Sequence, residues 1–247
     1  MGGVWGQYRD VTIPVQSVYA QSESQKYPLG LRLALGDRVF RYAKAGGVAL
    51  VAGKMNAAVA HVANHVGVTQ TAYGMVAGQT VVNVLLTATT PTADQYKDGY
   101  LSIDSGTGAG QMYKIKSHTL ATTPCVVTLY DPIVTAVADT AEASLVPNKW
   151  RSVVAMPLTA VAPAAGVALL AVDIGYFCWL QVKGLVSALV DTGDTLVVGE
   201  CAGYPATPTV IGGFGNPAVT DQIYGYCWYV AAADKFSVVN LNGLGND

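Results

Sequence analysis

Two histidines four residues apart form the best candidate for a metal site in this sequence. His61 and His65 stand in His-Val-Ala-Asn-His, and on a helix this spacing would place both imidazoles on one face, as zinc sites require. The zinc-protease pattern has Glu directly after the first histidine, where this chain has Val62. The third histidine, His118, is remote in sequence, and no acidic cluster supplies another ligand. We therefore predict no metal ion and interpret the pair as a solvated or hydrogen-bonded helix end.

Two glycine-containing segments resemble nucleotide-binding loops only in part. Residues 106–110 (Gly-Thr-Gly-Ala-Gly) would need a further glycine at Gln111 and a following helix, whereas a strand pattern follows. Around Gly53-Lys54, a phosphate-binding loop would need glycine at Val48 and Ser or Thr at Met55. We predict a hairpin loop for residues 106–110 and expect no cofactor.

Paired carboxylates could supply the acid and base of a glycoside hydrolase. The candidate pairs are Asp191 with Asp194 and Asp104 with Asp131. Asp191 and Asp194 flank Thr-Gly, and Asp131 precedes a proline, which are ordinary turn positions for aspartate. No Gly-x-Ser-x-Gly motif occurs, and no histidine is flanked by a nucleophile and an orienting acid. We predict no catalytic residues and no enzymatic activity.

The four cysteines, Cys125, Cys178, Cys201 and Cys227, form no Cys-x-x-Cys pair. All except Cys201 lie within apolar runs, which favours buried free thiols. A disulfide between two strands stays open, because sequence spacing gives no geometry.

The elements that would position these side chains are mainly β-strands. Apolar and polar residues alternate on both sides of Gly36-Asp37, so residues 31–42 predict a hairpin. The Ala-rich residues 43–66 predict one short helix, which their glycines limit to between one and three turns. From residue 69 onward, short β-rich runs between turn residues predict β-sandwich or barrel-like lobes. The expected strands are residues 81–86, 100–103, 111–116, 125–130, 176–182, 185–189, 195–198, 223–230 and 236–241.

The chain is expected to form an extended N-terminal arm, residues 1–30, and two β lobes, residues 31–147 and 148–247. Gln, Ser and Tyr dominate residues 16–27, and such polar segments order against a neighbour rather than alone. Deleting residues 1–27 is therefore expected to weaken attachment to a partner without preventing folding. The interface residues expected in the arm are Tyr8, Val11, Ile13, Val15, Val18, Tyr19 and Tyr27.

The composition indicates a chain that hides its surface in lasting contacts. Hydrophobic residues make up 51% of the chain, charged residues only 12%, and the net charge is -2. An average domain carries about 25% charged residues, and permanent interfaces are more apolar than transient ones. No basic cluster favours nucleic acid. Residues 153–172 are uncharged but contain Pro157 and Pro163, so no membrane span is expected, and no signal peptide is visible.

Three stretches carry a family resemblance. The first comprises residues 27–43 (Tyr-Pro-Leu-Gly-Leu-Arg-Leu-Ala-Leu-Gly-Asp-Arg-Val-Phe-Arg-Tyr-Ala) and residues 49–54, and the others are residues 99–133 and 175–199. They resemble the capsid decoration and minor head proteins of tailed bacteriophages. The resemblance implies a virion protein on the outer capsid surface that binds the major capsid protein, forms a homo-oligomer, often a trimer, and reinforces the shell. It carries over no catalytic residue and no defined contact residue.

The sequence leaves more than one function open. The first is a capsid decoration, or cement, protein. The alternative is a carbohydrate- or receptor-binding module of a phage fibre or spike, which would use aromatic side chains exposed on loops such as residues 204–224. An enzyme acting on a glycan is a third possibility, which the missing catalytic constellation disfavours.

Overall fold

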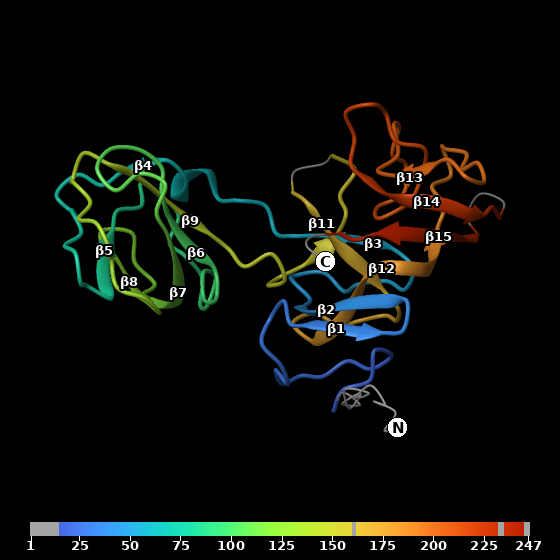
Figure 1. The fold of residues 1–247 in the computed structure, drawn as a ribbon, viewed down its shortest axis with the longest axis horizontal. Helices are drawn as coiled ribbons and strands as arrows, with labels where there is room; N and C mark the ends of the chain where they lie inside the picture. The colour runs from blue at the N-terminus through green and yellow to red at the C-terminus, as the bar shows by residue number, and fades with distance from the viewer. Residues whose placement is uncertain (1–14, 160–161, 232–234, 245–247) are drawn as a thin grey trace, which may run out of the picture.

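Two antiparallel β-sheets, each curled into a half-barrel, make up the part of the chain that the computed structural model describes, residues 15–159, 162–231 and 235–244. Figure 1 shows them as two lobes joined by two chain segments. Each sheet packs around a hydrophobic cluster of its own. The predicted class, mainly β with sandwich- or barrel-like lobes, is confirmed.

The larger sheet is built around one long strand, β12 (Phe177–Leu189), whose two halves pair with different neighbours. Its first half pairs with the hairpin strand β2 (Arg38–Lys44), and its second half pairs with β15 (Phe236–Asn242). Trp179 and Tyr42 lie at the centre of its core. The remaining strands are β10 (Val154–Ala155), β3 (Met55–Ala57), β11 (Ala164–Ala168), β14 (Ile223–Tyr229), β13 (Cys201–Gly203) and β1 (Arg32–Leu35).

The smaller sheet begins at β4 and ends at β5, and a side-chain amide links these two edges. Gln70, which is fully buried, donates from Nε2 to the carbonyl of Leu85 and accepts the amide of Leu85 at Oε1. This amide replaces the strand pairing that would otherwise close the half-barrel. The strands in sheet order are β4 (Val68–Thr69), β9 (Glu142–Val146), β6 (Tyr100–Ile103), β7 (Met112–His118), β8 (Cys125–Leu129) and β5 (Val81–Val84).

The strands are grouped differently from the predicted lobes, residues 31–147 and 148–247. β1, β2 and β3 belong to the sheet of the later strands, because β2 pairs with β12 and β3 pairs with β11. The smaller sheet is therefore inserted between β3 and β10. Alternation of apolar and polar residues predicts that a segment is a strand, but it does not predict which other strand the segment pairs with.

The helix expected within residues 43–66 is reduced to one 3-10 turn, η1 (Ala63–His65). The rest of this stretch is the end of β2, β3 and loops. Its alanines lie inside the sheet instead, where Ala43 pairs with Cys178 and Ala57 with Ala164. Small side chains fit there because both faces of this part of the sheet are covered.

Most predicted strands form, with two differences. The hairpin at residues 31–42 is confirmed, with Leu35 opposite Arg38 across Gly36-Asp37. Residues 176–182 and 185–189 are one strand, β12, rather than two. Residues 195–198 are not a strand; the nearest, β13, starts at Cys201.

The described part of the N-terminal arm, residues 15–30, packs on its own chain. The side chain of Gln16 donates from Nε2 to the backbone carbonyl of Phe177 (2.9 Å). The backbone carbonyl of Gln16 accepts the indole N–H of Trp179 (3.1 Å). Val18 is buried in the core of the larger sheet. We therefore correct the expectation for a deletion through residue 27, which would remove core contacts. Only residues 1–14 lie outside the described part of the arm.

Candidate interaction surface

One face of the larger sheet is left uncovered where the second half of β12 meets β15, β14 and β13. The N-terminal arm and the hairpin cover the first half of β12, and all six residues from Phe177 to Val182 are buried. Beyond Gly184 the strand alternates, so that Leu185 and Ser187 are exposed while Val186 is buried. We call the uncovered side, which carries Leu185, Tyr226, Trp228, Tyr229, Ile223 and Phe236, the open face.

Strand register aligns the open face. Leu185 lies opposite Asn240, Asn240 opposite Tyr226, and Tyr226 opposite Cys201, so one row of side chains crosses four strands. Paired residues in antiparallel strands point to the same side of a sheet. The row therefore brings together residues that are far apart in the sequence.

A β-bulge in β14 places two consecutive aromatic side chains in solvent. Cys227 pairs with Val239 and Tyr229 with Val238, so Trp228 is the extra residue of the bulge. The bulge interrupts the alternation of buried and exposed residues. As a result Trp228 is 65% exposed and Tyr229 is 59% exposed.

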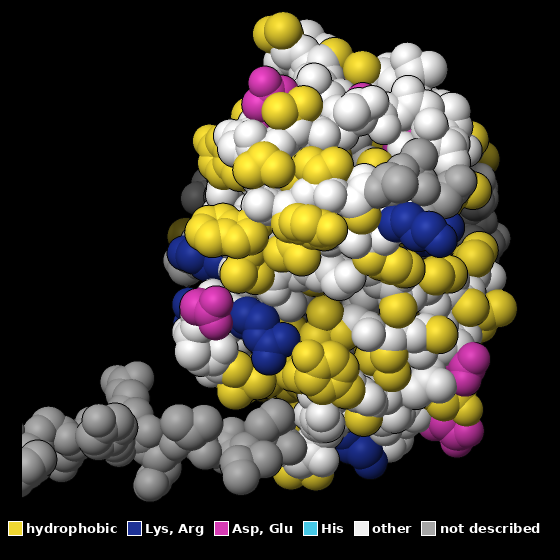
Figure 2. Space-filling model, turned by 90° about the vertical axis from the view of Figure 1, so that its right-hand side faces the viewer, with side chains coloured by type: hydrophobic (Ala, Val, Ile, Leu, Met, Phe, Trp, Pro, Cys, Tyr) yellow, Lys and Arg dark blue, Asp and Glu magenta, His cyan; other side chains and the backbone are white. Residues whose placement is uncertain are grey.

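The open face is apolar over most of its extent. Figure 2 shows many hydrophobic side chains across this side of the larger lobe, with a few Lys or Arg side chains among them and other charged side chains at the edge. Exposed Val219 lies in the loop before β14, and exposed Val197 and Val198 lie in the loop before β13, which bonds to β14 through the Gly199 amide and the Cys227 carbonyl. Large contiguous apolar patches of this kind mark interaction sites.

A hollow at one end of the open face adds polar groups to the exposed indole. Asp37, Asn240 and Asn242 line it together with Trp228, and it encloses about 460 Å³. Gly184 makes this arrangement possible, because a Cβ there would lie 2.6 Å from the carbonyl oxygen of Asp37. The glycine lets the hairpin turn approach β12 and brings Asp37 to the hollow.

Two aspartates fix the loop that borders the other end of the open face. Asp191 is fully buried and accepts hydrogen bonds from the amides of Gly193, Thr209 and Val210 and from the Thr209 hydroxyl. Burial alone would raise the pKa of Asp191, but these hydrogen bonds together hold it below its usual value. Asp194 accepts the amide of Asn216 (3.0 Å).

No protein-family model, no curated protein and no solved structure matches this chain. Its function is therefore inferred from the open face and from the chain's composition. The described residues include no helix with the length and apolar character of a membrane span.

The two candidate zinc ligands are not brought together. His61 is exposed in a loop, whereas His65 is fully buried. The Nε2 atom of His65 lies 2.5 Å from the carbonyl oxygen of Thr89 and must donate to it, so Nδ1 accepts from the hydroxyl of Tyr96 (2.5 Å). Among the described residues no group of three or more His, Cys, Asp or Glu could hold a metal ion. His65 is a hydrogen-bonded residue at the end of η1.

The other sequence candidates have structural roles in the described chain. Residues 106–110 form the predicted hairpin loop, between β6 and β7. Asp191 and Asp194 hold turns and loops, as expected for these positions. Asp104 accepts from Ser102 (2.8 Å) and Asp131 follows β8 in another loop. Gly53-Lys54 precedes strand β3, and all four cysteines are free.

The expected interface residues of the arm have different environments. Tyr8, Val11 and Ile13 lie outside the described residues. Val15 and Tyr19 are exposed, whereas Val18 is buried and Tyr27 packs against Tyr42 and Trp179 of the same chain. Val18 and Tyr27 thus serve the chain's own core in this structure.

Sequence reasoning missed the open face itself. The aromatic run in residues 223–230 was predicted as a strand, but its exposed side was not identified. The available signal was the adjacent pair Trp228-Tyr229, because strict alternation cannot bury both.

Proposed function

We propose that this chain is a structural subunit of a virus shell, a capsid decoration protein that associates with copies of itself and with the major capsid protein. The single observation that carries the proposal is the open face, an apolar sheet surface with exposed aromatic side chains. Aromatic side chains are enriched at protein–protein interfaces and dominate their energetics.

The composition supports permanent association. The described chain exposes 25 large hydrophobic side chains, while charged residues make up only 12% of the sequence. Exposed apolar side chains are normal when scattered, but on the open face Leu185 and Tyr226 lie in one row across β12, β15 and β14, with Asn240 between them. Burying this face in an interface would remove its apolar surface from water, which stabilises the association by about 25 cal/mol for each Å² buried.

A cement protein needs this combination of features. Closed symmetry and many copies allow modest individual contacts to add up to firm attachment. A net charge of -2 produces little repulsion between neighbouring copies. The sequence resemblance to decoration and minor head proteins suggests that copies of this chain attach to the capsid shell.

Light scattering during size-exclusion chromatography tests the self-association. We expect an oligomer larger than the 25.7 kDa monomer at micromolar concentration, and we expect Trp228→Asp to shift it toward monomer. Met112→Asp is the matched control, because Met112 is similarly exposed (59%, against 65% for Trp228) but lies on the smaller sheet. A monomeric wild-type protein, or equal effects of both substitutions, would contradict the assignment of this face.

Co-sedimentation tests the attachment to a shell. Shells assembled from the major capsid protein of the same genome are mixed with wild-type protein and with Trp228→Asp. We expect the wild type to sediment with the shells on their outer surface. Wild-type protein that stays in the supernatant would remove the capsid part of the proposal.

A carbohydrate-binding module is the second candidate, and the hollow beside Trp228 favours it. An exposed indole can stack on the apolar face of a sugar ring, and Asp37, Asn240 and Asn242 could bond its hydroxyls. A glycan array probed with wild type, Trp228→Ala and the control Tyr100→Ala decides this. Binding that only Trp228→Ala abolishes would favour the module, and no bound glycan would eliminate it.

A further inference from the structure

A second hollow lies at the β13 end of the open face. Cys201 of β13 and Tyr226 of β14, which are opposite each other in the sheet, both line it. Ile223 and residues 199–200 and 216–219 complete the lining, and the space encloses about 510 Å³. We call it the β13 hollow. Its lining is mostly apolar, and Glu200 is the one charged residue in it.

Hydrogen bonds fix the segments that line the β13 hollow. The amide of Asn216 donates to the carboxylate of Asp194 (3.0 Å). The amide of Ala218 donates to the carboxylate of Asp221 (3.0 Å), and the amide of Asp221 donates back to the carbonyl of Ala218 (3.0 Å). Residues 199–200 are bonded to the backbone of β14. The hollow is therefore preformed, and a preformed site loses little conformational entropy when it is filled.

The same face carries a protruding side chain, the indole of Trp228. It is the most exposed aromatic side chain of the open face, because the bulge in β14 turns it into solvent. Its N–H makes no hydrogen bond to any of the residues that the structure describes. Trp228 borders the hollow beside Asp37 and is not among the residues that line the β13 hollow. The chain therefore does not fill the β13 hollow with its own indole.

An indole fits the β13 hollow in size and in chemistry. Pro217, Val219 and Ile223 offer apolar contacts to the faces of the ring. The side chains of Glu200 and Asn216 offer oxygen acceptors to its N–H, and a buried tryptophan usually finds such a partner. The volume lies within the range of about 300–1,000 Å³ that is common for sites that enclose a ligand.

We propose that Trp228 of one copy inserts into the β13 hollow of a second copy, and that the second copy returns the same contact. The inference rests on the self-association proposed above and names the contact that produces it. Tyr226 lines the hollow and lies two residues before Trp228 in β14. Two open faces that meet in this way are related by a two-fold axis close to Tyr226. A contact of this symmetry closes at two copies.

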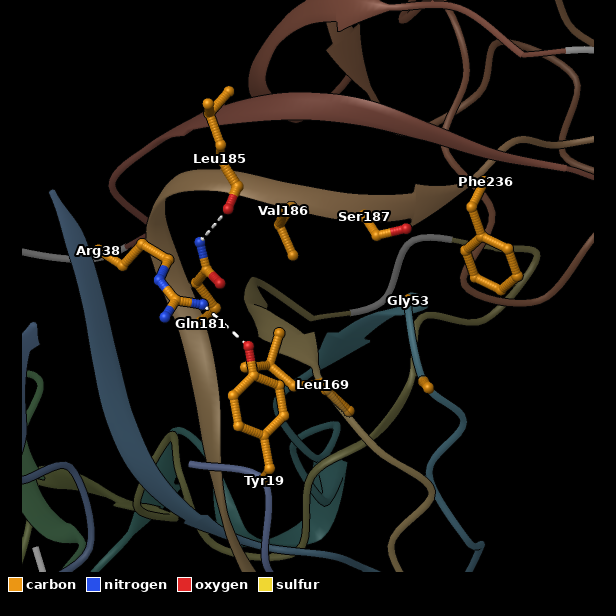
Figure 3. Close-up of a pocket in the computed structure, with 11 residues that line it drawn as sticks. Tyr19, Arg38, Gly53, Leu169, Gln181, Leu185, Val186, Ser187 and Phe236 are labelled. Carbon is orange, nitrogen blue, oxygen red and sulfur yellow. Dashed lines mark hydrogen bonds between the residues drawn. The ribbon is translucent and has the colours of Figure 1, made fainter. Parts of the chain in front are cut away.

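The exposed area of the open face agrees with a dimer. Tyr226, Trp228 and Tyr229 are 48%, 65% and 59% exposed. Because a whole aromatic side chain offers about 150–250 Å², these three expose about 300 Å² per copy. The smallest specific interfaces bury roughly 600 Å² per partner, so the three rings supply about half of that area. Leu185 adds to it, because its side chain points away from that of buried Val186 (Figure 3), and the lining of the β13 hollow supplies more.

Mixing two variants with complementary defects tests the contact. Trp228→Ala removes the indole and leaves the hollow intact, whereas Ile223→Asp places a charge in the hollow and leaves the indole intact. Size-exclusion chromatography with light scattering measures the mass. We expect twice the 25.7 kDa of one chain for the wild type and a shift to 25.7 kDa for each variant alone. The equimolar mixture should regain the dimer mass, because one of the two contacts can form between the unlike chains.

Two further variants control this experiment. Val134→Asp adds the same charge at a side chain that is 76% exposed on the smaller lobe, so it should keep the dimer. Val219→Asp is a second hollow variant, and it should dissociate the dimer without disturbing the sheet, because Val219 is fully exposed in a loop. Circular dichroism of each variant confirms that its sheets are formed before the masses are compared.

The outcomes separate this inference from the proposed function. A dimer that survives both Ile223→Asp and Val219→Asp overturns the inserted indole. So does a mixture of folded variants that is no more dimeric than each variant alone, and a wild-type oligomer larger than two copies overturns the two-fold contact. In each of these cases the proposed function stands if Trp228→Asp still dissociates the wild type and Met112→Asp does not. A monomeric wild type would remove both proposals.

Discussion

Two buried tyrosines of the larger sheet differ in what their hydroxyls contact. The hydroxyl of Tyr42 donates to Gln16 Oε1 (2.7 Å) and accepts the amide of Lys26 (3.1 Å), and thereby holds the arm on the sheet. The hydroxyl of Tyr224 is buried with no hydrogen-bond partner. Burial raises the pKa of Tyr224 above its ordinary value. An unpaired buried hydroxyl opposes folding, whereas a paired one supports it.

This difference gives opposite expectations for the same substitution. Tyr224→Phe should leave the free energy of unfolding unchanged or raise it by up to about 1 kcal/mol, because it removes an unsatisfied group. Tyr42→Phe should lower it by about 1–3 kcal/mol, because Gln16 and Lys26 lose their partner. Urea denaturation of both variants measures the contrast. A larger loss for Tyr224→Phe than for Tyr42→Phe would show that Tyr224 has a partner.

Asp191 should make folding sensitive to acid. Its pKa is lowered in the folded state, so its contribution to stability is present above the unfolded value of about 3.9 and is lost as the pH falls through the folded value. Asp191→Asn should lower the melting temperature at pH 7 and reduce its further fall between pH 5 and pH 2. Calorimetry at several pH values tests this. An unchanged acid slope in the variant would show that other carboxylates dominate.

Among the elements, β12 depends most on a single residue. Gly184 has φ +85°, and a Cβ there would meet the Asp37 carbonyl at 2.6 Å, just beyond the irregularity between Gln181 and Lys183. Gln181 donates to the carbonyls of Lys183 and Leu185, on both sides of this glycine. The bend at Gly184 lets β12 pair with β2 along its first half and with β15 along its second half.

Replacing Gly184 can distinguish two costs of a side chain there, the steric clash with the Asp37 carbonyl and the strain of a positive φ. Gly184→Ala should destabilise the protein through both the clash and the backbone strain. The backbone strain alone costs on the order of 1–3 kcal/mol. Gly199→Ala is the matched control, because Gly199 has φ +83° and a Cβ there would meet nothing within 4 Å. Chemical denaturation should show the larger loss for Gly184→Ala. Equal losses would mean that the hairpin turn moves away without difficulty.

At the scale of the whole molecule, the two hydrophobic clusters predict two unfolding units. Three of the four tryptophans, Trp150, Trp179 and Trp228, lie outside the smaller sheet, and the fourth, Trp5, lies outside the described residues. Fluorescence from Trp150, Trp179 and Trp228 therefore reports on the lobe of the larger sheet, while circular dichroism reports on both. The ion pair between buried Arg151 and partly exposed Asp98 (3.5 Å) is a contact that joins the lobes.

A substitution that creates a cavity in the smaller lobe should separate the fluorescence transition from the circular dichroism transition. Leu101 is fully buried in its core, and Leu101→Ala should destabilise that lobe by about 2–5 kcal/mol. We expect the circular dichroism transition to broaden or split while the fluorescence midpoint stays in place. If both midpoints shift together, the lobes unfold as one cooperative unit.

The sequence alone determined the features that depend on near neighbours in the chain. Alternation around Gly36-Asp37 specified the hairpin, and β6 was predicted with its observed bounds, Tyr100–Ile103. Turn residues likewise identified the loop at 106–110 and the structural roles of Asp191 and Asp194. These signals are local, because side-chain period and turn chemistry need only a few consecutive residues.

Only the tertiary structure decided which strands are partners and which side chains stay exposed. β11 (Ala-Ala-Gly-Val-Ala) escaped prediction because small residues form a strand there through burial on both faces. The arm's residues 15–30 proved to cover their own sheet, and the open face arises from a bulge and from long-range register. Exposure depends on what other segments cover, and that coverage comes from residues more than a hundred positions away.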